Sequence, residues 1–110
     1  MSETGFSLDH INLPARDPEA LARWYAQTFG LHATANRVSG PGVLIAFQVG
    51  EPVGRAPELH IGFRVPSRAA LDQWAGQFGA QLKVGNEFVS FQTRDPEGNC
   101  VEIYCKKDNA

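Results

Sequence analysis

Apolar and polar residues alternate along several stretches of the chain, and a period of two is typical of β-strands with one buried face. The strands expected on this ground cover residues 8–13, 43–49, 59–65, 88–93 and 100–105, with weaker signals at 33–38 and 81–84. The motif Asp-Pro-Glu-Gly at residues 95–98 has proline second and glycine fourth, as in a type I turn. It therefore predicts a tight turn between the last two strands.

Two helices are predicted where apolar residues recur every three or four positions. The expected apolar stripes are Leu21, Trp24, Tyr25 and Phe29 in the first helix, and Leu71, Trp74 and Phe78 in the second. Asp17 and Ser67 stand at the N-cap positions, Pro18 suits a first helical turn, and Gly30 ends the first helix. Each helix thus follows the first strand of one half of the chain.

The two halves of the chain resemble each other. Shifted by 50 positions, six residues between His10 and Gln27 coincide with identical residues between His60 and Gln77, and a tryptophan is among them. With a shift of 44, residues 44–49 resemble 88–93, and 51–54 resemble the turn at 95–98. We therefore expect a duplicated unit.

The predicted organisation is one domain, residues 1–110, made of modules 7–57 and 58–105. The fold class is α+β, with each module built as a strand, a helix and further strands. The first module looks abbreviated, because residues 50–57 contain two prolines and two glycines where the second module has its last strand. A loop is expected there.

Composition narrows the function classes. The chain has 110 residues, 43% of them hydrophobic, and a net charge of −2, which suits a compact domain rather than a disordered or nucleic-acid-binding segment. Its longest apolar run, 43–47, is far below the ~20 residues of a membrane helix, and no signal peptide is visible. Cys100 and Cys105 would lie roughly 16 Å apart on one strand, so free thiols and a reducing cytoplasm are expected.

Strand alternation sorts the side chains into two faces. The face opposite the helices is expected to carry His10, Asn12, Gln48, His60, Arg64, Ser90, Gln92, Glu102 and Tyr104. This mixture suits a curved, partly enclosed polar pocket for a small molecule. His10, His60 and Glu102 are a plausible ligand set for one divalent ion, Fe, Mn, Ni, Co or Zn, with positions left open for a substrate.

The sequence resembles the vicinal oxygen chelate superfamily, which includes glyoxalase I, fosfomycin-resistance proteins, methylmalonyl-CoA epimerase, extradiol dioxygenases and bleomycin-resistance proteins. The most specific match is Asp-Pro-Glu-Gly-Asn-Cys-Val-Glu-Ile-Tyr at 95–104, which is similar to the family's closing motif, with Glu102 at the metal-binding position. Leu-Asp-His-Ile at 8–11 and Leu-His-Ile-Gly-Phe at 59–63 resemble the openings of the two modules.

The resemblance implies paired βαβββ modules that form a cupped, partly closed mixed sheet with the helices outside. It also implies a homodimer with metal sites shared between chains, because short members of the family commonly have this form. A fourth ligand, known in glyoxalase I-like members, would fall on Glu58 or Gln48. Glu58 lies only two residues before His60, so the three-ligand set looks more like the fosfomycin-resistance or dioxygenase branches.

Several roles stay open at this stage. Tyr104 could act as an acid or orient a substrate oxygen, while Gln48, Arg64, Ser90, Gln92 and Asn12 could contact the substrate. Arg64 could equally be a rim charge, and Ser90 and Gln92 could satisfy each other. Apart from the expected ligands, the chain has one histidine, His32, whose position after the first helix argues against an extradiol dioxygenase.

Three functions follow. The first is a metal-dependent lyase, isomerase, epoxide-opening enzyme or oxygenase that acts on a small molecule with chelating oxygens. The second is a metal-free drug-binding protein of the bleomycin-resistance type. The third is a regulatory or assembly module in which the metal is a structural clamp.

Overall fold

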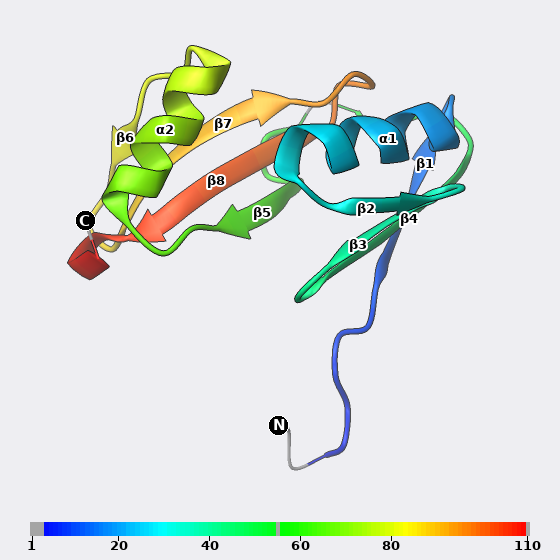
Figure 1. Ribbon diagram of the computed structural model, residues 1–110, viewed down its shortest axis with the longest axis horizontal. Helices are drawn as coiled ribbons and strands as arrows, with labels where there is room; N and C mark the ends of the chain where they lie inside the picture. The colour runs from blue at the N-terminus through cyan, green and yellow to red at the C-terminus, as the bar shows by residue number, and fades with distance from the viewer. Residues whose placement is uncertain (1–3, 55, 110) are drawn as a thin grey trace. The chain divides into compact units, whose positions relative to one another are not determined.

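The computed structural model describes residues 4–54 and 56–109, and the chain divides into two compact units, Met1–Val53 and Gly54–Ala110. The first contains β1 (Ile11–Ala15), α1 (Pro18–Phe29), β2 (His32–Thr34), β3 (Arg37–Gly40) and β4 (Val43–Val49). The second contains β5 (His60–Arg64), α2 (Arg68–Phe78), β6 (Lys83–Val84), β7 (Phe88–Arg94), β8 (Cys100–Lys106) and a short 3-10 helix, Lys107–Asn109 (Figure 1).

The two units share one topology. The strand order is β1-β4-β3-β2 in the first sheet and β5-β8-β7-β6 in the second. In each sheet the first and last strands of the unit pair in parallel, and the remaining pairs are antiparallel. The α+β class and the tandem βαβββ modules are therefore confirmed, as two open four-stranded sheets.

The first module is not short of a strand, contrary to expectation. The weak signal at residues 33–38 resolves into two strands, because Ala35 adopts a left-handed conformation (φ 52°) between β2 and β3. The partner of β8 in the repeat is β4, since both lie parallel to the first strand of their unit. The shift of 44 had matched β4 with β7. Within the first module, the strand that is shortened is β3, which has four residues, whereas its counterpart β7 has seven.

The helix boundaries agree with the capping signals. The Asp17 side chain accepts a hydrogen bond from the Ala20 backbone N–H, and the Ser67 side chain accepts one from Ala70. Gly30 ends α1 with φ 70°, a left-handed conformation that glycine adopts without steric cost. These local contacts set where each helix begins and ends.

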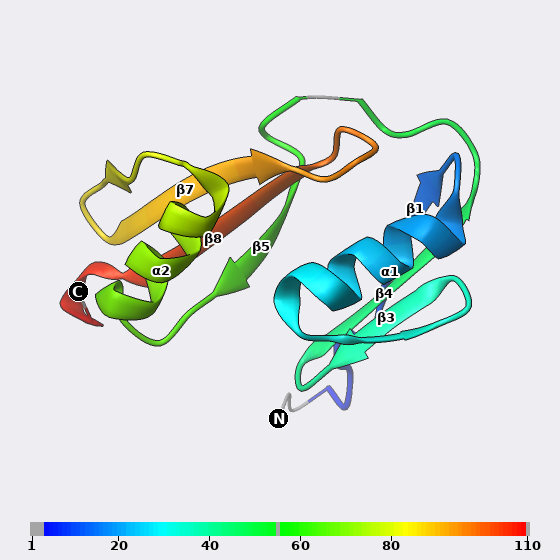
Figure 2. The same ribbon diagram turned by 45° about the horizontal axis from the view of Figure 1, so that its top comes forward.

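Each sheet is covered by its helix on one face (Figure 2). In the first unit Tyr25 is fully buried and stacks on Phe47, with ring centroids 5.7 Å apart. In the second, Phe78 packs on Phe91 at 5.9 Å. The helix-facing residues of β8 are Val101, Ile103 and Cys105, all buried. The expected alternation of faces is confirmed for β4, β7 and β8.

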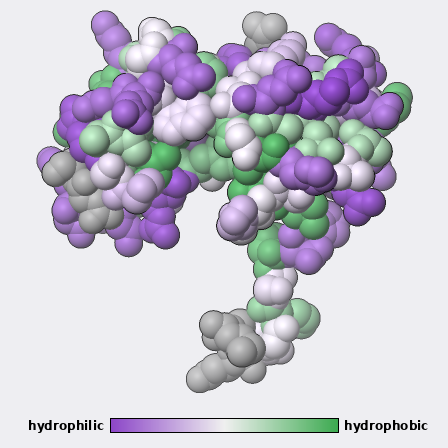
Figure 3. All heavy atoms as spheres, in the orientation of Figure 1, coloured by the Kyte–Doolittle hydropathy of each residue, from purple (hydrophilic) through white to green (hydrophobic). Residues whose placement is uncertain are grey.

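The main difference at a strand boundary lies at the beginning of the chain. The first strand was expected from residue 8 but β1 begins at Ile11. Phe6 and Leu8 are exposed, and Figure 3 shows hydrophobic residues along this extended segment. Within the described part of the chain, neither long helix combines the length and apolar character needed to cross a membrane.

Candidate metal and small-molecule site

The open face of the second sheet, opposite α2, is hollowed into a cavity of about 660 Å³. Four strands contribute to it, because every second residue of each strand points to this side. The sequence-predicted residues that line it are His60, Ser90, Gln92, Glu102 and Tyr104. Five of the nine residues expected on one polar face are therefore brought together within one unit.

His60 and Glu102 meet through the register of two parallel strands. Glu102 on β8 pairs with Gly62 on β5, and His60 lies two residues before that glycine on the same face. Since Gly62 has no side chain, nothing from this position separates the two groups. His60 Nε2 lies 3.6 Å from Glu102 Oε1.

The other ring nitrogen of His60 fixes the orientation of the imidazole. His60 Nδ1 lies 2.9 Å from the Pro57 carbonyl oxygen, which can only accept, so Nδ1 carries the hydrogen. In the neutral ring, Nε2 then presents a lone pair towards the Glu102 carboxylate. This arrangement is stabilised either by a proton on Nε2 or by a metal ion bound between the two acceptors.

The spacing of these two atoms suits two ligands of one divalent ion. Ligand atoms about 2.1 Å from an ion in tetrahedral geometry stand roughly 3.4 Å apart, close to the spacing observed. Metal-bound histidines usually donate their second N–H to a backbone carbonyl or a carboxylate, as His60 does. His60 and Glu102 would therefore hold such an ion in the second unit.

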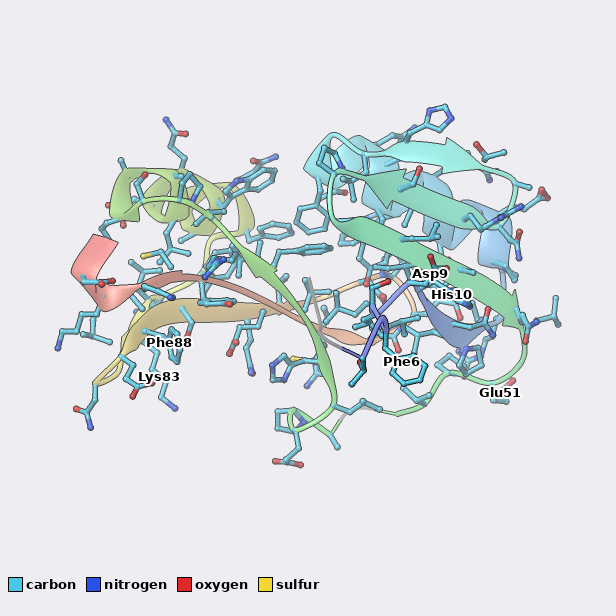
Figure 4. All side chains as sticks on the ribbon, turned by 90° about the horizontal axis from the view of Figure 1, so that it is seen from below. Phe6, Asp9, His10, Glu51, Lys83 and Phe88 are labelled. Carbon is cyan, nitrogen blue, oxygen red and sulfur yellow. The ribbon has the colours of Figure 1, made fainter. Side chains whose placement is uncertain are left out.

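His10 belongs to the first unit and lies one residue before β1. Its Nδ1 is 2.8 Å from Asp9 Oδ2, so a carboxylate orients this ring and leaves Nε2 directed elsewhere (Figure 4). The side chain of His10 is 54% exposed. In the described residues of either unit, no three His, Cys, Asp or Glu side chains gather into a metal-binding cluster.

Because β4 is the equivalent of β8, the residue of the first module that corresponds to Glu102 can be identified, and with it the position of a possible fourth metal ligand. Ile11 pairs with Ile45, and its counterpart Ile61 pairs with Val101. Ala46 therefore occupies in β4 the position that Glu102 occupies in β8. The first module carries no carboxylate at the equivalent position. Gln48 lines a separate shallow hollow, beside Asn36 and the start of α1.

The remaining predicted contacts divide between the cavity and the surface. Ser90 and Gln92 make no hydrogen bond to each other, and both face the cavity. Tyr104 packs edge-on against Phe88, with ring centroids 5.3 Å apart. Arg64 is exposed and does not line the cavity, and Asn12 is exposed in the first unit.

Lys83 and Phe88 are among the cavity residues that the sequence did not single out. Lys83 lies on β6 opposite Ser90, and Phe88 begins β7 with 42% of its surface exposed. The weak strand signal at residues 81–84 was sufficient to predict the position of Lys83. Once that strand pairs with β7, alternation places Lys83 on the open face.

The predicted turn between β7 and β8 is confirmed and holds Glu102 in register. The Gly98 N–H donates to the Asp95 carbonyl at 3.0 Å, and the buried Asp95 carboxylate accepts from the backbone N–H groups of Glu97 and Asn99. Cys100 follows, and burial is the main cause that raises the pKa of its thiol; Glu102 adds to this, and Arg94 opposes it. Both cysteines are free, as expected.

Comparison with known proteins agrees with this architecture. A fosfomycin resistance protein, FosX, from Mesorhizobium loti has a TM-score of 0.68 and 22% identity, over 96% of this chain and 93% of that one. A "possible glyoxalase" from Bacillus cereus has a TM-score of 0.71 and 20% identity, over 92% and 100%. A glyoxylase/bleomycin resistance protein/dioxygenase domain from Frankia sp. EAN1pec has 0.66 and 16%, over 96% and 95%.

At these identities the solved structures establish the fold alone. No curated protein was found to match the chain. The family model for the Glyoxalase/Bleomycin resistance protein/Dioxygenase superfamily matches residues 7–103, nearly the whole sequence. The chain therefore belongs to the Glyoxalase/Bleomycin resistance protein/Dioxygenase superfamily.

Proposed function

We propose that this protein is a divalent-metal-dependent enzyme acting on a small molecule, with His60 and Glu102 as two of its metal ligands. The observation that carries the proposal is the pair of acceptors, His60 Nε2 and Glu102 Oε1, held 3.6 Å apart at a cavity wall. His10 is proposed as the third ligand, because Asp9 orients its ring as Pro57 orients that of His60.

The chemistry belongs to a class rather than to one reaction. A bound divalent ion would polarise two neighbouring oxygens of the substrate as a Lewis acid. Tyr104 would hold a proton at its phenol oxygen, on the same strand face as Glu102 and two residues away. Ser90 and Gln92 would orient the substrate through hydrogen bonds from the neighbouring strand. Lyase, isomerase, epoxide-opening and oxygenase reactions all fit these roles.

The site is proposed to be shared in a homodimer, with His10 supplied by one chain and His60 and Glu102 by the other. This arrangement follows the family resemblance. The two buried free thiols suit a reducing compartment, so we propose a cytoplasmic protein.

Metal content tests the proposal directly. The full chain, purified without a histidine tag, is incubated with Zn²⁺, Co²⁺, Ni²⁺, Mn²⁺ or Fe²⁺, desalted, and measured by mass spectrometry beside His60→Ala. We expect near one ion per chain for the wild type and a large loss in the variant. His32→Ala is the matched control, because His32 lies on β2 outside the cavity.

The opposite outcome identifies the second function. If the wild type binds none of the ions, or if His32→Ala loses metal as His60→Ala does, the metal proposal fails. The cavity would then be that of a metal-free small-molecule binding protein.

A further inference from the structure

We infer that the cavity of the second unit takes a small anionic molecule, whose charged group binds Lys83 and whose apolar part lies against Phe88. This inference deepens the proposed function and rests on it for the place of the site. It does not depend on the metal, because the residues that carry it, Lys83, Phe88, Ser90 and Tyr104, are not among the proposed metal ligands.

Lys83 stands at one end of a row of polar residues that crosses the sheet. It pairs with Ser90, and Ser90 pairs with Tyr104, so the three side chains share the open face in neighbouring strands. All three line the cavity. Figure 4 shows Lys83 and Phe88 together on the side of the sheet away from α2. An ammonium group beside two hydroxyls offers several hydrogen-bond donors to one anionic group.

These donors are not engaged within the protein. Among the described residues, the side chains of Lys83, Ser90 and Tyr104 make no hydrogen bond or ion pair. Glu87 also lines the cavity but forms no ion pair with Lys83. The charge of Lys83 is therefore available to a ligand.

The cavity is polarised along its length. The charged or titratable groups that line it are His60, Lys83, Glu87, Glu102 and Tyr104. Lys83 and Glu102 are separated by two strand spacings and one two-residue step, which places their Cα atoms roughly 12 Å apart. A molecule that reaches from the Glu102 end would present its far end to Lys83. A negative group is favoured at that far end.

An aromatic ring supplies an apolar surface next to Lys83. Phe88 lines the cavity two residues before Ser90, the partner of Lys83, and Tyr104 packs edge-on against it. An exposed phenylalanine beside an unpaired lysine favours a ligand with both an apolar body and an anionic group.

The test uses the metal-free full chain and a matched pair of probes. The ¹⁵N-labelled protein, kept in a chelator, is titrated with phenylacetate and with phenylacetamide, and amide shifts of β6 and β7 are followed by NMR. We expect phenylacetate to bind about threefold to fivefold more tightly than the neutral amide, the range of a partly exposed charge pair.

Variants assign the difference to one side chain. Lys83→Met, which keeps an unbranched apolar stem, should remove the preference for the anion, and Lys83→Arg should retain it. Lys107→Met is the matched control, because Lys107 is exposed and lies outside this cavity. Equal affinities for the two probes, an absence of saturable shifts with phenylacetate, or a preference that survives in Lys83→Met would overturn the inference. The metal proposal is tested separately, because only the measurement of metal content can contradict it.

Discussion

At the scale of single residues, the site depends on the absence of a side chain at Gly62 as well as on His60 and Glu102. Gly62 lies opposite Glu102 in the parallel register and brings no side chain between Glu102 and His60. The Pro57 carbonyl takes the hydrogen of His60 Nδ1, so the lone pair of Nε2 faces the carboxylate. The strand pattern predicted the side of the sheet for both groups, but the tautomer depends on a loop carbonyl that no pattern encodes.

Glu102 faces His60 across the parallel register, whereas Glu58 lies in the loop before β5. Loss of an outer partner of a metal ligand costs about 10–100-fold in affinity. Removing the Glu102 carboxylate should therefore weaken Zn²⁺ or Co²⁺ binding in Glu102→Gln by more than about a hundredfold, measured by competition with a chromogenic chelator. Glu58→Gln is the matched control, because Glu58 is exposed and precedes β5. A comparable loss in both variants would count against Glu102 as a specific ligand.

The cysteines give a second prediction at this scale. Cys100 and Cys105 are 2% and 0% exposed, and burial raises the pKa of the Cys100 thiol, so little reactive thiolate is accessible in the folded chain. We expect iodoacetamide at pH 7.5 to modify the native protein at least about tenfold more slowly than the protein in urea. Intact-mass measurement reports both rates. Rapid modification of the native protein would contradict the burial of β8.

At the scale of elements, local signals were sufficient for the helices and not for the pairing of strands. Asp17, Ser67 and Gly30 mark helix ends through contacts within a few residues, and all three were readable from the sequence. The equivalence of β4 with β8 depends on which strand lies beside the first strand of each unit, a non-local contact. The similarity at a shift of 44 therefore led to an incorrect match with β7.

Removal of a helix cap is expected to have a measurable cost. In Ser67→Ala the Ala70 backbone N–H loses its side-chain acceptor, which should lower the free energy of unfolding by about 1 kcal/mol. Ser67→Asp restores an acceptor at the N-terminus of α2 and should recover most of the loss. Urea denaturation followed by far-UV circular dichroism compares the three proteins. Equal midpoints for wild type and Ser67→Ala would show that the cap contributes nothing.

At the scale of the whole molecule, the proposed ligands are divided between the two units. His10 lies in the first, whereas His60 and Glu102 lie in the second. The repeat predicted that both histidines lie at equivalent positions within the first strand of each module; in the structure His60 begins β5, whereas His10 lies one residue before β1. Which chain supplies His10 to a given site is a separate question, because a repeat within one sequence is compatible with either assembly.

Mixing of variant chains answers that question. In a dimer with shared sites, a heterodimer of His10→Ala and Glu102→Gln holds one site with all three ligands intact, because each chain supplies what the other lacks. Random pairing makes half of the dimers heterodimers, so about a quarter of the sites should be intact. We expect denatured and refolded equal mixtures to bind about a quarter of the wild-type Zn²⁺, while each variant alone binds little.

The contrary result is equally informative. If each site takes all its ligands from one chain, mixing cannot restore any site, and the mixture will bind no more metal than the two variants measured separately. A mixture of Glu102→Gln with His60→Ala is the internal control, because both variants damage the same half of the site and no pairing repairs it. Restored binding in that control would show that the ligands are not those proposed.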